Sequence, residues 1–211
     1  MELVRTKPGI IRAEHDREIS GSSLMLLKEK RTTFSGSYVE LGSGSGMHLL
    51  RLAQANPELL CIGLEIRFKR AFKTGEKAER LGLDNLIVFR TDARQISTLF
   101  EPGSVSAFFV NYPDPWDKRK WLKNRLLNAD LLKTMHTCLG PHGFLRYKTD
   151  HQEYFASTCE LFLPDLWETR KHTANLLESP WAESNIPTEF EQLFKSQGKP
   201  LCMVEVVKRG R

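Results

Sequence analysis

The chain has 211 residues, of which 40% are hydrophobic and 27% charged, and its formal charge at pH 7 is +5. This composition excludes extended disorder, and no apolar run reaches the roughly 20 residues that a membrane span requires. The four cysteines are far apart, with no CxxC pair and no histidine at metal-ligand spacing, so neither a metal site nor a disulfide framework is expected. The N-terminus lacks the apolar run of a signal peptide, which favours a cytoplasmic location, and the positive charge favours polyanionic partners.

The first 37 residues differ in composition from the rest of the chain. They are polar and punctuated by glycines, with one helix-like stretch from Ser22 to Lys30. We expect a flexible arm over residues 1–37, followed by a single domain over residues 38–211.

From Tyr38 onward, short β-rich runs alternate with longer amphipathic runs. That alternation predicts an α/β fold of the Rossmann-like kind, with a seven-stranded, mostly parallel sheet and helices on both faces. A segment rich in Glu, Ser and Pro, from Leu176 to Thr188, is interpreted as a surface insertion between the last two strands. The expected strands are Tyr38–Leu41, Leu60–Leu64, Leu86–Arg90, Val105–Asn111, Phe144–Lys148, Trp167–Thr173 and Leu201–Lys208, and helices are expected to begin near Gly46, Phe68, Ala93, Asn124 and Gln152.

A glycine-rich loop, Glu40-Leu41-Gly42-Ser43-Gly44-Ser45-Gly46, joins the first predicted strand to the first helix of the domain. Glycines such as Gly42 and Gly44 let the backbone turn tightly and let a ligand lie against it. The GxGxxG pattern of dinucleotide sites fails because Met47 and Leu49 stand where a third glycine is needed. The phosphate-binding P-loop is also excluded, because no Gly-Lys-Ser or Gly-Lys-Thr follows.

Three acidic residues follow three consecutive predicted strands. Glu40 opposes a pyrophosphate but suits a ligand with positive charge, such as S-adenosylmethionine. Glu65 can accept hydrogen bonds from both ribose hydroxyls, and Asp92 can accept from the adenine amino group. Each residue alone, Asp92 above all, has a plainer interpretation as a helix cap or a solvated turn carboxylate.

The fourth predicted strand is followed by Asn111-Tyr112-Pro113-Asp114-Pro115-Trp116, in which two prolines flank an acid. The prolines stiffen the loop and aim Asp114, although an ordinary Asx-Pro turn would also explain the acid, and Trp116 could pack in the core. A run of five cations comes next. Such runs are usually solvated, but beside a ligand-binding edge this one is interpreted as a contact to a phosphate backbone. Its members are Lys118, Arg119, Lys120, Lys123 and Arg125, with Trp121 between them.

Four motifs in this order resemble the motif set of the tRNA (guanine-N7)-methyltransferases: the glycine loop, Pro113-Asp114-Pro115-Trp116 with its basic tail, Lys148-Thr149-Asp150, and Thr188-Glu189-Phe190-Glu191. The resemblance covers residues 38–208. It implies a class I methyltransferase fold and transfer of a methyl group from S-adenosylmethionine to N7 of a guanine in the variable loop of tRNA, giving 7-methylguanosine and S-adenosylhomocysteine.

The resemblance also implies site residues. Glu40, Gly42, Gly44, Glu65 and Asp92 would bind the cofactor together with Asp114, which is also the catalytic position. Substrate would be held by Lys118, Asp150, Thr188, Glu189, Phe190 and Glu191. Thr188 and Glu191 also have the spacing of a capping box, and the two roles are compatible.

The chain departs from the family in the basic tail. Asp117 stands where proline or histidine is common, and Trp121, Leu122 and Asn124 stand where many members have two histidines and a further arginine. Guanine N7 carries an exposed lone pair, so its methylation requires no strong general base and no metal. The expected partner is tRNA, with no membrane partner. The protein is expected to be a monomer or a homodimer. The alternatives are an enzyme of the same fold acting on another RNA or a small molecule, and a catalytically silent RNA-binding protein.

Overall fold

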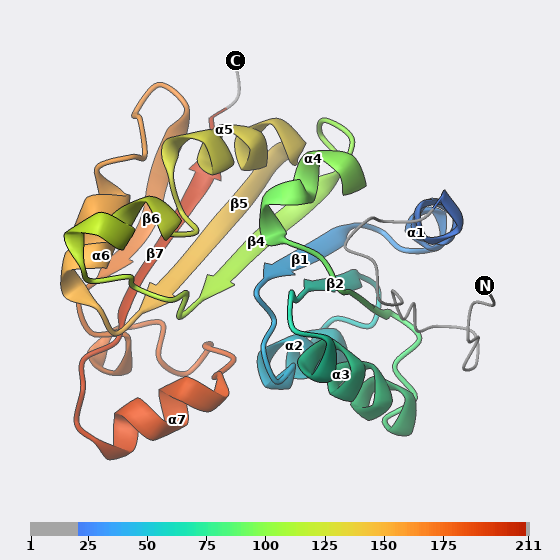
Figure 1. Cartoon of the computed structure of the whole chain (residues 1–211), viewed down its shortest axis with the longest axis horizontal. Helices are drawn as coiled ribbons and strands as arrows, with labels where there is room; N and C mark the ends of the chain where they lie inside the picture. The colour runs from blue at the N-terminus through green and yellow to red at the C-terminus, as the bar shows by residue number, and fades with distance from the viewer. Residues whose placement is uncertain (1–20, 210–211) are drawn as a thin grey trace. The chain divides into compact units, whose positions relative to one another are not determined.

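The structure, a computed structural model, describes residues 21–209, and these form two compact units, residues 21–99 and residues 100–209. The predicted α/β class is confirmed, since seven strands alternate with helices along the chain (Figure 1). The described part of the predicted arm contains helix α1 (Gly21–Thr33), in which Leu27 is buried. The division into an arm and one domain remains a prediction, and residues 1–20 lie outside the described part. No helix within residues 21–209 is long and apolar enough to cross a membrane.

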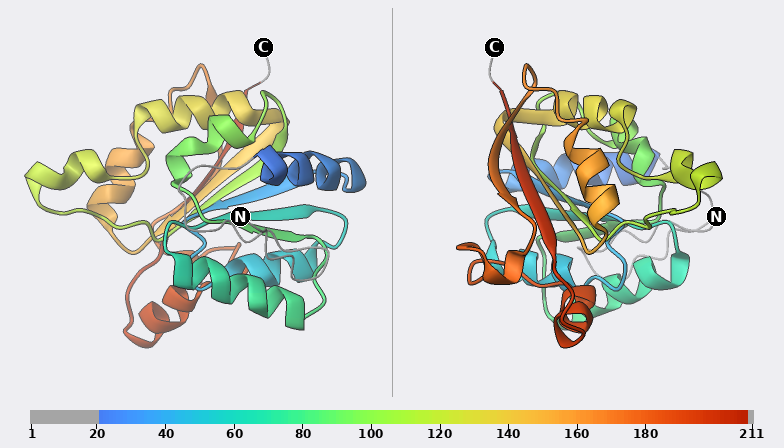
Figure 2. Two further views of the ribbon diagram at one scale, coloured as in Figure 1. Left: turned by 45° about the vertical axis from the view of Figure 1, so that its right-hand side comes forward. Right: turned by 90° about the vertical axis from the view of Figure 1, so that its left-hand side faces the viewer.

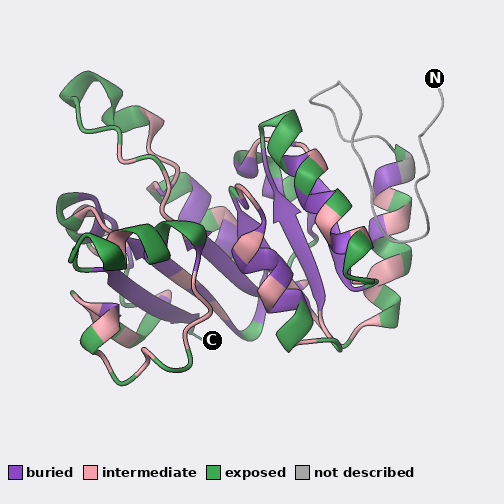
Figure 3. Cartoon of the chain, turned by 90° about the horizontal axis from the view of Figure 1, so that it is seen from below, coloured by how far each residue is buried: buried purple, intermediate pink, exposed green. Residues whose placement is uncertain are grey.

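The first unit is a parallel three-stranded layer in the order β3-β2-β1, built from β1 (Ser37–Leu41), β2 (Leu60–Leu64) and β3 (Leu86–Phe89). Helices α2 (Met47–Ala55) and α3 (Phe68–Arg80) pack on β2 and β3, and α1 lies on the opposite side of these strands (Figure 2). After β3 come a 3-10 turn, η1 (Ala93–Gln95), and the short helix α4 (Ile96–Leu99). Every residue of β2 and β3 is buried, as expected for strands covered on both faces (Figure 3).

The second unit is a mixed four-stranded layer in the order β4-β5-β7-β6. Strands β4 (Val105–Asn111) and β5 (Leu139–Thr149) are parallel, while β7 (Cys202–Lys208) runs antiparallel to β5 and to β6 (Trp167–Thr173). The remaining elements are the 3-10 helix η2 (Arg119–Asn124), α5 (Ala129–Cys138), α6 (Gln152–Cys159), the 3-10 turn η3 (Leu176–Glu178) and α7 (Glu189–Ser196).

Alternation along the strands gives the layer of the second unit two different faces. Tyr147 of β5 packs against Tyr154 and Phe155 of α6, so α6 covers the apolar face. Its neighbours Arg146 and Lys148 point to the other face, which the segment after β6 covers.

Two predicted boundaries were wrong. Helix α5 begins at Ala129 and not near Asn124, because Asn128 caps it by accepting a hydrogen bond from Leu131 N, and residues up to Asn124 form the 3-10 helix. Strand β5 begins at Leu139, five residues before Phe144, with a register irregularity opposite β4 where the turn-like Gly140-Pro141-His142-Gly143 passes. The predicted surface insertion is also partly buried, since Leu176 is only 1% exposed and packs against Leu201 and Met203.

Candidate functional site

The glycine loop of the first unit adopts left-handed backbone conformations. Gly42, Gly44 and Gly46 have φ angles of 72°, 56° and 77°. A side chain at Gly46 would collide with Thr74 of α3, so glycine is needed there for close packing. At Gly42, by contrast, an added Cβ would meet nothing within 4 Å, so the space beside this part of the loop is open.

Glu65, the first residue after β2, binds the glycine loop directly. Its Oε2 accepts a hydrogen bond from Gly44 N at 2.8 Å, and its Oε1 accepts one from Arg67 N at 2.8 Å. The residue is 5% exposed. Each carboxylate oxygen keeps a further lone pair, so Glu65 can position the loop and still accept from a ligand.

Glu40, near the end of β1, is also buried, and its Oε1 lies 3.2 Å from Nδ1 of His48 in the first turn of α2. No sequence motif had singled out His48. Asp92 is half exposed and caps η1 by accepting from Arg94 N at 2.9 Å, so the capping interpretation of this residue is confirmed. The cap uses only Oδ1 of this carboxylate. The other oxygen, Oδ2, accepts from Arg94 Nη1 at 3.3 Å.

Two thiols of the chain, Cys61 and the partly buried Cys159, are poor nucleophiles. Burial, reinforced by the charges of Glu40 and Glu58, raises the pKa of Cys61 to about 12, and burial raises the pKa of Cys159 to about 11. These thiols are protonated at neutral pH, which disfavours covalent catalysis by them.

In the second unit, the loop that carries Asp114 is strained. Tyr112 and Trp116 have φ angles of 51° and 49°, in the left-handed region that large side chains rarely adopt. They flank Pro113-Asp114-Pro115, whose rings fix two more φ angles. Asp114 itself is exposed. Backbone strain of this kind persists only where the surroundings enforce it, and it is concentrated at functional sites.

Two contacts to α6 and its N-cap hold this loop. Arg125 Nε donates to Pro115 O at 2.8 Å and Nη1 donates to Ser157 Oγ at 3.0 Å, while the guanidinium lies over the ring of Tyr154. His151 Nδ1 accepts from Tyr154 N, so its Nε2 carries the proton that it shares with Asp117 Oδ1 at 2.7 Å. Arg125 therefore has a structural role in the loop, and its interpretation as a phosphate contact stays a prediction.

Asp150 follows β5 as Asp114 follows β4, and the register pairs Asn111 with Lys148, so the two acids leave neighbouring strand ends. Tyr112 N donates to Lys148 O at 2.8 Å at the same edge. The hydroxyl of Tyr112 is buried and has no hydrogen-bond partner among the described residues. Its pKa is raised by burial and by the charges of Glu191 and Asp150, so the phenol stays neutral.

The Thr188-Glu189-Phe190-Glu191 segment begins α7 with a complete capping box. Thr188 and Glu191 are buried, whereas Glu189 and Phe190 are exposed. Glu191 Oε1 accepts from Lys148 Nζ at 2.6 Å, and its Oε2 accepts from Asn185 Nδ2 at 2.6 Å. This buried network ties α7 to strand β5.

A family model described as "Putative methyltransferase" matches residues 35–204. The tRNA (guanine-N(7)-)-methyltransferase of Mycoplasma pneumoniae is 31% identical over 202 residues, which cover 94% of this chain and 94% of that protein. The chain belongs to the tRNA (guanine-N7)-methyltransferase family. A bifunctional glycosyltransferase/methyltransferase of Fusobacterium nucleatum is 34% identical over 87% of this chain, which spans only 30% of that longer protein. The solved structure of the 16S rRNA methyltransferase KamB shares the fold, with a TM-score of 0.69 at 16% identity over 93% of this chain and 97% of that one.

In this member of the tRNA (guanine-N7)-methyltransferase family, the predicted site residues fall into two groups. The first unit brings together the glycine loop and Glu65, with Glu40 and Asp92 at the ends of the flanking strands. The second unit brings Asp114 and Asp150 to one strand edge, and aromatic contacts from Tyr112 to Phe190 and Phe194 put α7 beside it. Lys118 lies in the exposed tail with its Nζ over Trp121.

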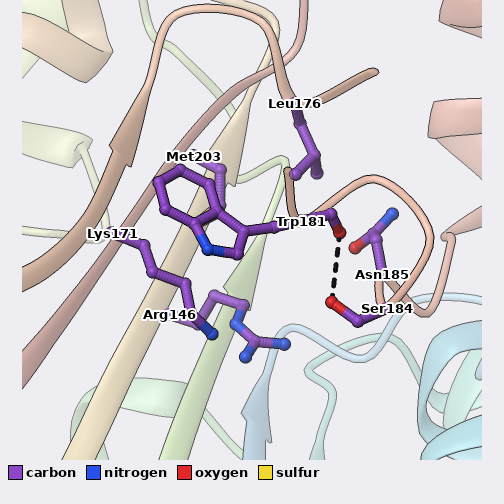
Figure 4. A pocket seen from close by; sticks show the side chains of 7 residues that line it. All are labelled: Arg146, Lys171, Leu176, Trp181, Ser184, Asn185 and Met203. Carbon is purple, nitrogen blue, oxygen red and sulfur yellow. Dashed lines mark hydrogen bonds between the residues drawn. The ribbon is translucent and has the colours of Figure 1, made fainter. Parts of the chain in front are cut away.

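The structure also shows a small hollow over the charged face of the second unit (Figure 4). Glu205 of β7 pairs there with Arg146 and with Lys171 at 3.0 Å. Burial opposes the ionisation of Glu205, but the adjacent charges of Arg146 and Lys171 hold its pKa below its usual range. The sequence did not predict this cluster because its members are far apart in the chain. The hollow is lined by Arg146, Lys171, Leu176, Trp181, Ser184, Asn185 and Met203.

Proposed function

We propose that this protein transfers a methyl group from S-adenosylmethionine to N7 of a guanine in the variable loop of tRNA, and that it does so in the cytoplasm as a monomer or homodimer. The products are 7-methylguanosine and S-adenosylhomocysteine. The Mycoplasma pneumoniae relative, which is named a tRNA (guanine-N(7)-)-methyltransferase, matches almost the whole chain and supports this proposal. The structural observation that carries the proposal is the pair of buried carboxylates beside an open glycine loop.

The first unit fits S-adenosylmethionine by its chemistry. The open space beside Gly42 admits a ligand against the backbone, and Ser43 Oγ is buried without a hydrogen-bond partner among the described residues. Glu40 and Glu65 offer buried acceptors, which suit the hydroxyl, ammonium and sulfonium groups of this molecule and oppose a pyrophosphate. Glu40, Gly42, Gly44, Glu65, Asp92 and Asp114 are the proposed cofactor-binding residues.

When bound, S-adenosylmethionine supplies an electrophilic methyl group. Guanine N7 has an exposed lone pair in the major groove, so the protein does not need to remove a proton before transfer. Its residues must hold the guanine in line and stabilise the positive charge that develops on the base. The strained loop presents Asp114 for the second task, and we assign Asp114 as the catalytic residue.

The proposed substrate residues are Lys118, Asp150, Thr188, Glu189, Phe190 and Glu191. The exposure of these residues separates those that can contact RNA from those that position α7. Lys118, Glu189 and Phe190 are exposed and can contact RNA directly, and Asp150 is half-buried at the strand edge. Thr188 and Glu191 are buried in the capping box and in the network with Lys148, so they act by positioning the beginning of α7.

The proposal is tested by incubating the protein with an unmodified tRNA transcript and methyl-labelled S-adenosylmethionine, and then digesting the tRNA to nucleosides. The expected result is label in 7-methylguanosine. Label in another nucleoside, or none in tRNA although S-adenosylhomocysteine binds, would reject the assignment in favour of another substrate. Failure to bind S-adenosylhomocysteine would favour a silent RNA-binding protein.

A further inference from the structure

An exposed aromatic patch lies on the basic tail after the strained loop. The indoles of Trp116 and Trp121 meet edge to face, with ring centroids 6.0 Å apart and an interplanar angle of 80°. They remain 36% and 38% exposed, and the neighbouring Leu122 is 39% exposed. Large aromatic side chains held at the surface mark an interaction site more often than isolated apolar residues do.

The charge around this patch selects the class of partner. The segment from Trp116 to Arg125 carries five cations against the single carboxylate of Asp117, a net of +4. The ammonium groups of Lys118 and Lys120 lie over the ring of Trp121, 4.9 and 5.2 Å from its centroid. An indole surrounded by lysines suits a polyanion that also presents flat aromatic groups.

The patch is held in place by the contacts that hold the strained loop. Arg125 bonds Pro115 O and Ser157, and His151 pairs with Asp117. Trp121 N donates to Lys118 O at 2.7 Å, which closes the first turn of η2. A platform that is already fixed loses little conformational entropy when a base stacks on it.

We propose that Trp121, supported by Trp116, is a stacking platform for an unpaired nucleotide of the RNA substrate, while Lys118 and Lys120 contact the adjacent phosphates. This inference rests on the proposed function and adds a specificity residue to it. Single-stranded nucleotides in RNA loops are recognised in this way, because an unstacked base exposes its π face to an aromatic side chain.

The test measures binding without catalysis, by titrating labelled tRNA with protein in the absence of S-adenosylmethionine. Trp121→Ala is expected to weaken tRNA binding by roughly 5- to 150-fold, which corresponds to the usual contribution of one stacked base. Trp121→Phe keeps a flat ring and should restore most of the affinity. The salt dependence of binding should be unchanged in both variants because no charge is removed, whereas Lys120→Ala should reduce its slope by about one.

Two controls separate stacking from loss of folding. Leu163→Ala removes another exposed apolar side chain of the second unit, 56% exposed, and should bind tRNA as the wild type does. A fully paired RNA duplex offers no unstacked base, so the wild type and Trp121→Ala should bind it equally.

Equal tRNA affinity of Trp121→Ala and the wild type would overturn the inference, as would a loss that Trp121→Phe does not restore. A dimer that Trp121→Ala converts to monomers with unchanged tRNA affinity would also overturn it, because the patch would then be a protein interface. These outcomes differ from failure of the proposed function, in which the wild type would form no 7-methylguanosine.

Discussion

Asp114 lies between two prolines and two residues of left-handed backbone conformation, so the backbone that carries its carboxylate has little freedom to move. A carboxylate carried on a rigid backbone needs less reorganisation when charge develops on the substrate, and low reorganisation is the usual source of electrostatic catalysis. Glu65 has a comparable role in the first unit, where it is fixed by two backbone donors.

Asp114→Asn keeps the size and polarity of the side chain but removes the charge. We expect turnover to fall by about 10²- to 10³-fold, because the developing positive charge on the base loses its partner. Single-turnover methylation measures the rate of methyl transfer, and tRNA titration measures tRNA affinity separately. The tRNA affinity should stay within about twofold of the wild-type value. Asp165→Asn, at an exposed and distant carboxylate, is the matched control. Normal turnover with weakened tRNA binding would show that Asp114 only binds substrate.

Glu65→Gln replaces one of the two acceptor oxygens with an amide nitrogen that cannot accept, so the hydrogen bond from either Gly44 N or Arg67 N is lost. We expect the affinity for S-adenosylhomocysteine to fall at least about tenfold, since hydrogen bonds to a charged group contribute roughly 1.5–3 kcal/mol. Calorimetric titration gives the affinity, and Glu58→Gln at an exposed position in the same unit serves as the control. Unchanged affinity would remove Glu65 from the cofactor site.

Helix α7 is held to the sheet of the second unit by buried charges and not by apolar contact alone. Lys148 is 1% exposed and Glu191 is 3% exposed, and Asn185 and Thr188 N complete the donors to the carboxylate. A buried pair of this kind adds little net stability over apolar residues, but removing one partner leaves an uncompensated charge.

Glu191→Ala should therefore lower the free energy of unfolding by about 3–5 kcal/mol. The double variant Lys148→Met with Glu191→Ala should be destabilised less than the sum of the single variants. Denaturant titration measures these values, and Glu189→Ala, at the exposed position two residues earlier, should change stability by less than about 0.5 kcal/mol. Additive effects would mean that Lys148 and Glu191 are not coupled.

The cluster of Glu205, Arg146 and Lys171 links stability to pH. Because the pKa of Glu205 is lowered in the folded state, its contribution is complete above the unfolded-state value of about 4.3 and is lost as the pH falls through the folded-state pKa. Glu205→Gln should thus be less stable than the wild type at pH 7, and the difference should shrink near pH 3. Urea titrations at both pH values measure it. A difference that stays constant with pH would contradict the assignment.

Most elements were predicted correctly from the sequence. The errors concern the starts of β5 and α5, and the contacts that depend on tertiary packing were not predicted. Apolar strands bounded by glycine or polar residues were located to within a residue or so, as with β2 and β4. Strand β5 was predicted too short because Gly140-Pro141-His142-Gly143 has the composition of a turn, and the start of α5 was missed although Asn128 is a typical N-cap. The contacts of Lys148 with Glu191 and of Arg125 with Pro115 depend on tertiary packing, so no local pattern indicates them.

For the whole molecule, family membership and local chemistry lead to the same reaction. The first unit supplies buried acceptors beside an open glycine loop, and the second supplies a carboxylate on a strained loop and an exposed surface of cations and aromatic rings. Both features suit methyl transfer to a base that needs no deprotonation. The chain's positive charge, +5, also favours association with RNA over a neutral small molecule.

The most direct test of this account uses tRNA in which 7-deazaguanosine replaces guanosine, because this base has a carbon in place of N7. We predict that the modified tRNA binds with nearly the affinity of ordinary tRNA but accepts no methyl label, whereas ordinary tRNA is labelled as 7-methylguanosine. Equal labelling of the two tRNAs would show that the methyl group goes to another atom and would contradict the proposed reaction.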